Sequence, residues 1–316
     1  MTARDLRALL RELLCRLTPA TARERALAAE LRATFAALPE LDADAATGAE
    51  AEWRRYMNTL RDQVRWRDPR AFLTWPVIRG TMFVRRSRYL ETELAYLKGL
   101  PDWQGRWAAA VREGRAGRPA PYPGLRASSG NLLHHAYHVA RFEAAVGARV
   151  ADMGTVFEFG GGYGSMCRLF RQVGFAGRYV VLDLPHFSAL QRYYLQALGL
   201  GLAEAGNHCV SDPEAPARLL AGAPRPTMFL ATWSLSETPL HVRKAVLPLV
   251  SGFDAFLIAF QGTFREVDNV AWFRALREEM PEIAWHDLPI GHLRGPNFYL
   301  FGRRRAAGRE AQATGL

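Results

Sequence analysis

Two different spacings of hydrophobic positions divide the chain near its middle. In the first 150 residues, apolar side chains recur three and four positions apart, which is the spacing along one face of a helix. This spacing predicts helices over residues 6–17, 22–38, 49–66, 89–97 and 103–112. A further helix is expected up to about residue 146, capped by a polar side chain of the segment Ser128-Ser-Gly-Asn131.

From residue 156 onward, short apolar runs alternate with amphipathic segments. The runs predict strands at 156–159, 179–182, 208–210, 227–231 and 255–259. Helices are expected between them, one of them capped by Thr238 with Pro239 at its first position. Strands at 282–287 and 297–301 then flank a loop and form an antiparallel hairpin. The pattern predicts an α/β fold: a Rossmann-like doubly wound sheet of about seven strands with a C-terminal antiparallel hairpin, preceded by a helical N-terminal region.

The first of these strands runs into a glycine-rich turn, Gly160-Gly-Gly-Tyr-Gly164. Its spacing is G-x-G-x-G, whereas a dinucleotide-binding turn would need a glycine where Ser165 stands. Glu158 precedes the turn by two residues, and Asp183 ends the next strand, where a carboxylate suits both ribose hydroxyls. A carboxylate at Glu158 would repel a pyrophosphate and attract a cation. The segment therefore predicts S-adenosylmethionine (SAM) as the cofactor; the alternative is an ordinary tight turn between a strand and a helix.

These residues resemble the class I SAM-dependent methyltransferases, and most closely the bacterial sugar O-methyltransferases, over roughly residues 125–302. The likeness is carried by the segments Glu158 to Gly164, Asp183-Leu-Pro185, Gln191-Arg-Tyr-Tyr-Leu195 and Ser234-Leu-Ser-Glu237. The resemblance implies a SAM-dependent O-methyltransferase that acts on a hydroxyl of a sugar, in a glycan, a nucleotide sugar or a glycosylated natural product.

Carried over position by position, the resemblance implies that Glu158 holds the cationic end of SAM and that Asp183 holds the ribose. Leu184 would pack on the adenine. Asp212, after the third strand, would either contact the adenine or cap the turn ahead of Pro213. The cofactor-binding residues expected in this way are Glu158, Gly160, Gly161, Gly162, Gly164, Asp183, Leu184, Asp212 and Trp233.

Methyl transfer to a hydroxyl requires alignment of the acceptor and removal of its proton. Ligands bind beyond the carboxyl ends of the strands in such sheets, where Glu237 follows the fourth strand. His135, His138 and His292 are the other candidate catalytic residues. A structural role is the alternative for each of the four. His134 and His138 share a helix face, but no acidic ligand accompanies them in the sequence, so no metal is predicted.

The formal net charge is +10, and all but two of the 41 basic residues are arginine. The densest runs, Arg79–Arg88 and Arg303–Arg305, are expected on a solvated face and in a tail. The alternative is attraction to an anionic substrate such as a nucleotide sugar or an RNA. An RNA methyltransferase and a non-catalytic methyltransferase-fold partner subunit are therefore the competing functional hypotheses.

The remaining expectations concern organisation and location. The pattern divides the chain into a helical region, 1–125, that covers the acceptor or forms a dimer interface, a SAM-binding domain, 126–305, and a flexible tail, 306–316. No long apolar run or signal peptide is found, and the three cysteines are widely separated, which together favour a cytoplasmic protein. The expected partners are a small-molecule or glycan acceptor and a second copy in a homodimer; nucleic acid is not expected.

Overall fold

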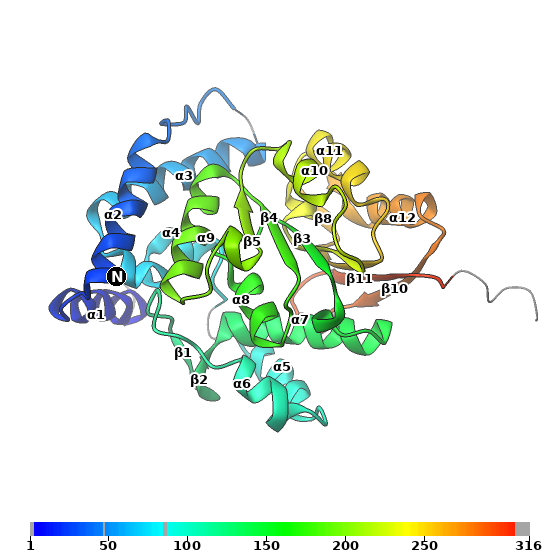
Figure 1. The fold of residues 1–316 in the computed structure, drawn as a ribbon, viewed down its shortest axis with the longest axis horizontal. Coiled ribbons are helices and arrows are strands. Elements are labelled where there is room, and N and C mark those ends of the chain that lie inside the picture. Colours follow the sequence, from blue (N-terminus) through cyan, green and yellow to red (C-terminus); the bar gives the residue numbers. More distant parts are fainter. Residues whose placement is uncertain (1–2, 47, 85–86, 307–316) are drawn as a thin grey trace, which may run out of the picture.

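The computed structural model of the chain describes residues 3–46, 48–84 and 87–306, and its centre is a seven-stranded sheet (Figure 1). The strand order is β10-β11-β7-β6-β3-β4-β5, in which β11 runs antiparallel to both neighbours. The strands are β3 (Thr155–Phe159), β4 (Arg178–Leu182), β5 (Asn207–Val210), β6 (Thr227–Thr232), β7 (Ala255–Gln261), β10 (Ile283–Pro289) and β11 (Asn297–Arg304). This arrangement confirms the predicted doubly wound sheet with its C-terminal hairpin.

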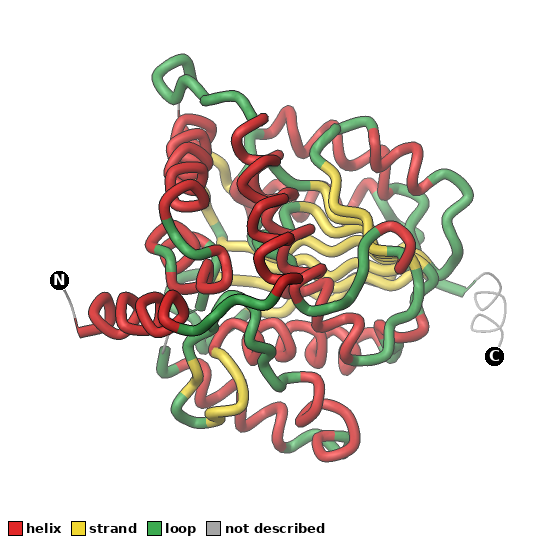
Figure 2. The backbone as a smooth tube through the Cα atoms, turned by 60° about the vertical axis from the view of Figure 1, so that its left-hand side comes forward, coloured by secondary structure: helices red, strands yellow, loops and turns green. Residues whose placement is uncertain are grey.

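Helices cover both faces of the sheet, as Figure 2 shows around the yellow strands. One face packs against α7 (Gly130–Val146), α8 (Ser165–Gln172) and α9 (Pro185–Ala197). The other packs against α10 (Ala215–Leu220), α11 (Leu240–Val250) and α12 (Asn269–Glu279). Successive strand residues alternate between the two cores, since Val156 belongs to the first and Phe157 to the second. Burial on both faces explains why the strands are continuously apolar.

The N-terminal region consists of helices that lie along α9 and α7 at one side of the sheet (Figure 1). They are α1 (Ala3–Leu17), α2 (Ala22–Ala37), α3 (Gly48–Trp66), α4 (Pro76–Thr81), α5 (Tyr89–Lys98) and α6 (Ala108–Ala110). Their apolar stripes join the first core, in which Leu60 and Leu94 are buried together with Leu133. The region therefore packs directly against the sheet domain and brings α4 and α5 toward it.

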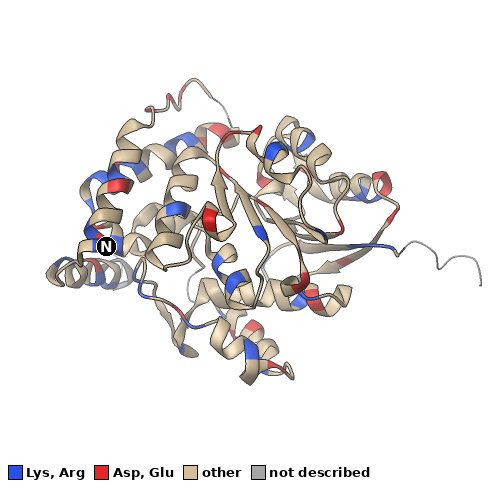
Figure 3. Cartoon of the chain, viewed as in Figure 1, with Lys and Arg blue, Asp and Glu red and all other residues tan. Residues whose placement is uncertain are grey.

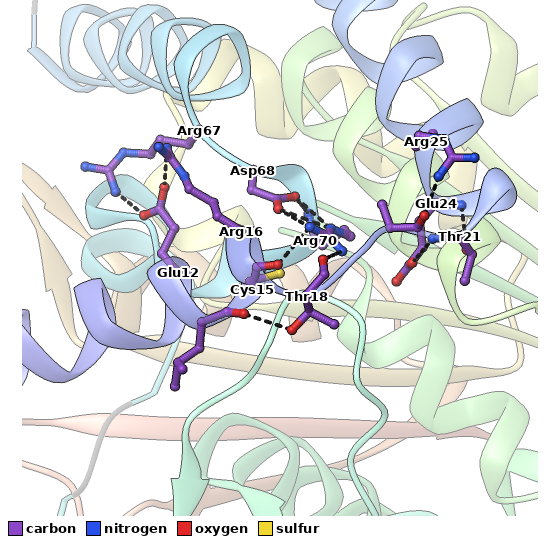
Figure 4. A network of polar contacts seen from close by, with 12 residues as sticks. Glu12, Cys15, Arg16, Thr18, Thr21, Glu24, Arg25, Arg67, Asp68 and Arg70 are labelled. Carbon is purple, nitrogen blue, oxygen red and sulfur yellow. Dashed lines mark hydrogen bonds and ion pairs between the residues drawn. The ribbon is translucent and has the colours of Figure 1, made fainter.

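A polar network attaches α1 to the rest of the region (Figure 4). Glu12 pairs with Arg67 at 2.6 Å and with Arg16 at 3.0 Å, while Arg70 donates to the carbonyl oxygens of Cys15 and Thr18. The leucines that predicted this helix are largely exposed, at 42–80% of their surface. The homodimer expected from the sequence stays a prediction.

Several local expectations are wrong. Residues 103–112 do not form one helix, because Trp103–Trp107 is a π-helical turn that buries both tryptophans, followed by the short α6. Thr238 does not cap α11: its hydroxyl donates to the Leu235 carbonyl at 2.8 Å, and the helix begins at Leu240. The helical turns at Pro69–Thr74 and α4 were not expected.

The stretch before α7 forms a small antiparallel ribbon, β1 (Pro121–Tyr122) and β2 (Leu125–Ser129). Ser129 is the residue of the expected capping segment that caps α7, because its side chain accepts a hydrogen bond from the Leu132 amide at 3.1 Å. A second ribbon, β8 (Thr263–Phe264) and β9 (Val267–Asp268), precedes α12.

The arginines near the C-terminus are part of the sheet. Arg303 and Arg304 lie in β11 and donate to carbonyl oxygens of Val146 and Phe253. They line a hollow of about 480 Å³ at the amino ends of β6 and β7, together with Arg225. The expectation of a tail is therefore wrong for these two residues, whereas residues 307–316 lie outside the described part of the chain. Arg85 and Arg86 of the other basic run also lie outside it, and Figure 3 shows basic and acidic residues interspersed over the helices.

Candidate active site

The strand order reverses between β3 and β6, and this is where open α/β sheets bind ligands. Three segments meet at the carboxyl ends of these strands. The glycine turn 160–164 follows β3, Asp183 and Leu184 follow β4, and residues 233–237 follow β6. The topology therefore brings together most of the residues that the sequence assigned to the cofactor.

The backbone of the glycine turn has a conformation that other residues rarely adopt. Gly160, Gly162 and Gly164 have φ angles of 72°, 58° and 92°. A Cβ on Gly160 would overlap the Cβ of Ser234, and one on Gly161 would lie 2.9 Å from Oε2 of Glu158. The turn is thus held between the loop after β6 and a carboxyl group, and it presents a surface without side chains.

Glu158 lies beneath this turn and is almost completely buried, with 3% of its surface exposed. The Tyr179 hydroxyl donates to its Oε2 at 2.9 Å. The pKa of Glu158 is raised to about 8, mainly by burial and to a smaller extent by the neighbouring Asp183, while the hydrogen bond from Tyr179 opposes the rise. At neutral pH the carboxyl group is consequently held mostly protonated, and a cation nearby would favour its ionised form.

Asp183 ties the end of β4 to the glycine turn. Its Oδ2 accepts hydrogen bonds from the Gly162 amide at 3.0 Å and from Gln191 at 2.8 Å, and its Oδ1 accepts one from the Leu184 amide at 2.7 Å. Burial raises the pKa of Asp183 to about 7, and these donors oppose that rise. Since a carboxylate oxygen accepts two hydrogen bonds, Oδ1 keeps an acceptor position.

Gln191 belongs to this site but was not among the expected cofactor residues. Its side-chain amide donates to the Gly162 carbonyl at 3.0 Å as well as to Asp183, and its own Oε1 is buried without a partner among the described residues. The sequence carried a signal for it, because Gln191 opens the Gln191-Arg-Tyr-Tyr-Leu195 segment of the resemblance.

The other expected cofactor residues, Leu184, Trp233 and Asp212, differ from one another in exposure and in the contacts they make. Leu184 follows β4 with 37% of its surface exposed, as a side chain that packs on a ligand would be. Trp233 follows β6 with a φ of 67°, which is rare for a residue with a Cβ, and its amide donates to the Ala259 carbonyl. Asp212 is exposed, pairs with Arg218 at 2.5 Å and caps the Glu214 amide at 2.9 Å. The structure thus shows the turn-capping role that was the alternative for Asp212.

Glu237 ends a 3₁₀ turn, Leu235–Glu237, between β6 and α11. Burial raises its pKa to about 7, with a contribution from Glu52, and Gln261 lies 3.5 Å from its Oε1. The carboxyl group precedes the first turn of α11 rather than lying in it. It is therefore a half-buried acid with a pKa in the range of a general base at neutral pH.

The expected histidines gather around a residue that the sequence analysis missed. Glu93 of α5 is fully buried, and its Oε1 lies 2.8 Å from Nδ1 of His134 and 2.9 Å from Nε2 of His292. The ring of His138 lies 4.1 Å from that of His134. His135, on the same helix, makes no hydrogen bond at its Nδ1 with the described residues.

A sequence signal for Glu93 does exist. It lies on the apolar stripe of its helix, since the buried residues of α5 are Leu90, Glu93, Leu94 and Leu97. A carboxyl group on a core-facing stripe needs a buried partner. The sequence could not name that partner, because His292 is 199 positions away.

Two further properties bear on the chemistry. Among the described residues, no three or more His, Cys, Asp or Glu side chains are arranged to hold a metal ion. None of the described helices combines the length and the apolar composition that a membrane crossing requires.

No protein-family model and no curated protein match the chain. Among solved structures, the methyltransferase domain of bacterial CtHen1 is 9% identical with a TM-score of 0.41, covering 54% of this chain and 97% of its own. An O-methyltransferase from Bacillus cereus in complex with SAH is 11% identical with a TM-score of 0.40, covering 72% and 95%. The SAH-bound methyltransferase PaMTH1 of Podospora anserina is 12% identical with a TM-score of 0.37, covering 72% and 92%. At these values, the functional proposal rests on the residues of the chain itself.

Proposed function

We propose that this protein is a SAM-dependent methyltransferase that methylates a hydroxyl group. The observation that carries the proposal is a glycine turn at the reversal of strand order with two carboxyl groups, that of the buried Glu158 below it and that of the half-buried Asp183 beside it. A nucleotide phosphate at this turn would meet two acids. A ligand with a positive charge and a ribose would instead find a counter-charge and an acceptor.

Two features of these residues fit SAM. The absence of a Cβ at Gly160 and Gly161 lets the backbone of the turn lie directly against Ser234 and Glu158, and Gln191 keeps a buried acceptor oxygen without a partner among the described residues. Bound there, SAM supplies a methyl group on a positively charged sulfur. Glu158 would offset the positive charge, Asp183 would accept hydrogen bonds from the ribose, and Leu184 would cover the adenine.

The acceptor that we propose is a sugar hydroxyl on a small molecule or glycan. Glu237 and the histidines around Glu93 are the groups able to take its proton. The N-terminal helices support a covering role, because Met82 lies 3.6 Å from where a Cβ on Gly162 would stand. The basic residues give less support to an RNA substrate, since Arg303 and Arg304 are hydrogen-bonded within the fold at the amino ends of the parallel strands.

Calorimetry with SAM and with NADH tests the cofactor. SAM should bind and NADH should not, and Asp183→Ala should weaken SAM binding while the exposed substitution Asp212→Ala should leave it unchanged. Tight NADH binding without a response to SAM would refute the proposal. A methylation assay on sugars and on bulk RNA separates the acceptor classes. Turnover on RNA alone would favour the RNA methyltransferase, and SAM binding without any turnover would favour a partner subunit.

A further inference from the structure

A buried polar cluster joins three elements that are far apart in the sequence. Glu93 lies on α5, His134 and His138 lie on α7, and His292 lies in the loop between β10 and β11. Glu93 and His138 have no exposed surface, and the Nδ1 of His138 lies 2.5 Å from the hydroxyl of Tyr299 on β11. In the described part of the chain, the hydrogen bonds of these side chains do not involve the glycine turn, Glu158 or Asp183.

Three buried polar atoms in this cluster and in the adjacent His135 have no partner among the described residues. They are Oε2 of Glu93, Nδ1 of His135 and Nε2 of His138. An unpaired buried polar atom is destabilising, so three in and beside one cluster point to a partner that the protein itself does not supply. A hydroxyl both donates and accepts hydrogen bonds, so a compound with neighbouring hydroxyls can pair with acceptor and donor atoms together.

The charge of the cluster favours a neutral ligand over an anionic one. Burial acts to raise the pKa of Glu93, but His134 and His292 outweigh it, so the pKa is lowered and the group is a carboxylate. Burial lowers the pKa of His135 to about 3 and that of His138 well below its usual value, so both are neutral. The other titratable or charged groups that face the cluster are Tyr89, Tyr96, Tyr122, Tyr137, Arg141 and Tyr299.

The carboxylate also fixes which nitrogen of each ring carries a proton. Because Glu93 accepts hydrogen bonds, His134 presents N–H at Nδ1 and His292 presents N–H at Nε2. In the tautomer of His292 that donates from Nε2, the lone pair is on Nδ1. The His292 side chain is 15% exposed and that of His134 5%, so His292 is the more accessible proton acceptor.

The cluster connects to the cofactor turn through one loop. The ring of His138 lies 6.4 Å from the ring of Trp233, which directly precedes Ser234. Ser234 is the residue whose Cβ a side chain on Gly160 would overlap. A ligand at the cluster and a ligand at the glycine turn would therefore share the loop after β6.

We propose that this cluster is the acceptor site, that it takes a sugar ring or a similar compound with neighbouring hydroxyls, and that Glu93 is a positioning residue for His292. The inference rests on the proposed methyl transfer. As the acceptor oxygen bonds to the methyl carbon, the carbon–sulfur bond of the donor breaks and the sulfur keeps its electron pair. The hydroxyl proton moves to Nδ1 of His292, and the Glu93 carboxylate stabilises the imidazolium.

The test compares the full chain with Glu93→Gln, His292→Asn, the double variant, Glu237→Gln and the exposed control His241→Asn. Calorimetry with SAM comes first. All variants should bind SAM within about threefold of the parent, which also shows that they fold. If the parent itself does not bind SAM, the proposed function fails, and this result is separate from the acceptor question.

Turnover is then measured as SAH release with methyl glycosides of glucose, galactose, mannose and rhamnose as probes. On a probe that is methylated, we expect Glu93→Gln to lower kcat about 100-fold with less than a threefold change in KM. The double variant should fall no further than His292→Asn alone, because Glu93 acts through His292. A purely structural Glu93 would instead lower kcat further in the double variant.

Three results would overturn the inference. The first is that the losses of kcat in Glu93→Gln and His292→Asn multiply in the double variant. The second is a loss of kcat confined to Glu237→Gln, which would make Glu237 the base. The third is no turnover of any glycoside by a protein that binds SAM. Nitrogen NMR of the histidines gives a second readout. His292 should carry its proton on Nε2 in the parent and lose this preference in Glu93→Gln, while His241→Asn leaves it unchanged.

Discussion

Glu158→Gln should stabilise the ligand-free protein and at the same time weaken its binding of SAM. The carboxyl group is buried under the glycine turn, and its pKa is raised from the ordinary 4.5 to about 8. A raised pKa of an acid means that the folded state binds a proton that the unfolded state releases between these two values. Stability in the parent therefore falls as the pH rises from about 4.5 to 8, and glutamine, which does not titrate, removes that loss.

The size of the effect follows from the pH range between the two pKa values of Glu158, 4.5 in the unfolded and about 8 in the folded state. Each pH unit costs about 1.4 kcal/mol while the two states differ by one proton. Between pH 5 and pH 8 the advantage of Glu158→Gln over the parent should grow by up to about 4 kcal/mol, since the group is 3% exposed and little screened. Glutamine keeps an oxygen for the hydrogen bond from Tyr179.

Thermal unfolding of both proteins at pH 5 and pH 8, without ligand, measures this difference. The variant should gain about 8 °C in Tm relative to the parent between the two pH values. Because the two chains differ at one position, the titrating groups that do not interact with Glu158 cancel in the comparison. A difference in Tm that is independent of pH would refute the assignment of a raised pKa. A SAM affinity unchanged by the substitution would refute the counter-charge role, for which a loss of about 10–100-fold is expected.

Three further predictions concern the same site. SAM binding at pH 7 should release roughly one proton, because the cation restores the ionised form of Glu158, and calorimetry in buffers of different ionisation enthalpy should show less release in Glu158→Gln. Gly162→Ala and Gly222→Ala should each cost about 1–2 kcal/mol in chemical denaturation, since both have φ near 60° and neither added Cβ would clash: Met82 would lie in ordinary contact at 3.6 Å from the one on Gly162, and nothing lies within 4 Å of the one on Gly222. Only Gly162→Ala should weaken SAM binding, and equal SAM affinities would exclude the turn as its site. Asp183→Asn should keep the fold and weaken the binding of SAM. It should weaken the binding of a methylthioadenosine that lacks the ribose 2′-hydroxyl by a smaller factor, and equal losses for the two ligands would place the ribose elsewhere.

The local sequence pattern was sufficient to predict the strands of the sheet and the glycine turn. A strand such as β7 is almost continuously apolar because both of its faces are buried, and this signal is complete within a few residues. Gly160 and Gly164 are likewise readable, since a left-handed backbone selects glycine wherever it occurs. The doubly wound arrangement of the sheet is a consequence of right-handed connections between such units.

Other expectations were wrong where contacts with the folded surroundings determine the local conformation. Thr238 had the sequence of a helix cap, but its hydroxyl bonds backward to Leu235. Residues 103–112 had the pattern of one helix, but the π-helical turn there accompanies the ion pair of Arg106 with Glu143 on α7. Caps and helix ends depend on such contacts, which a local pattern does not contain.

The sequence alone thus determined the fold class, the glycine turn and the two acids that flank it, because each follows from the conformations open to a short segment. Only the tertiary structure showed that Glu93 contacts both His134 and His292. It also showed that Gln191 donates a hydrogen bond to Asp183 and that Asp212 forms an ion pair with Arg218. These pairings join positions up to 199 residues apart, and the burial that perturbs Glu158 exists only once both faces of the sheet are covered.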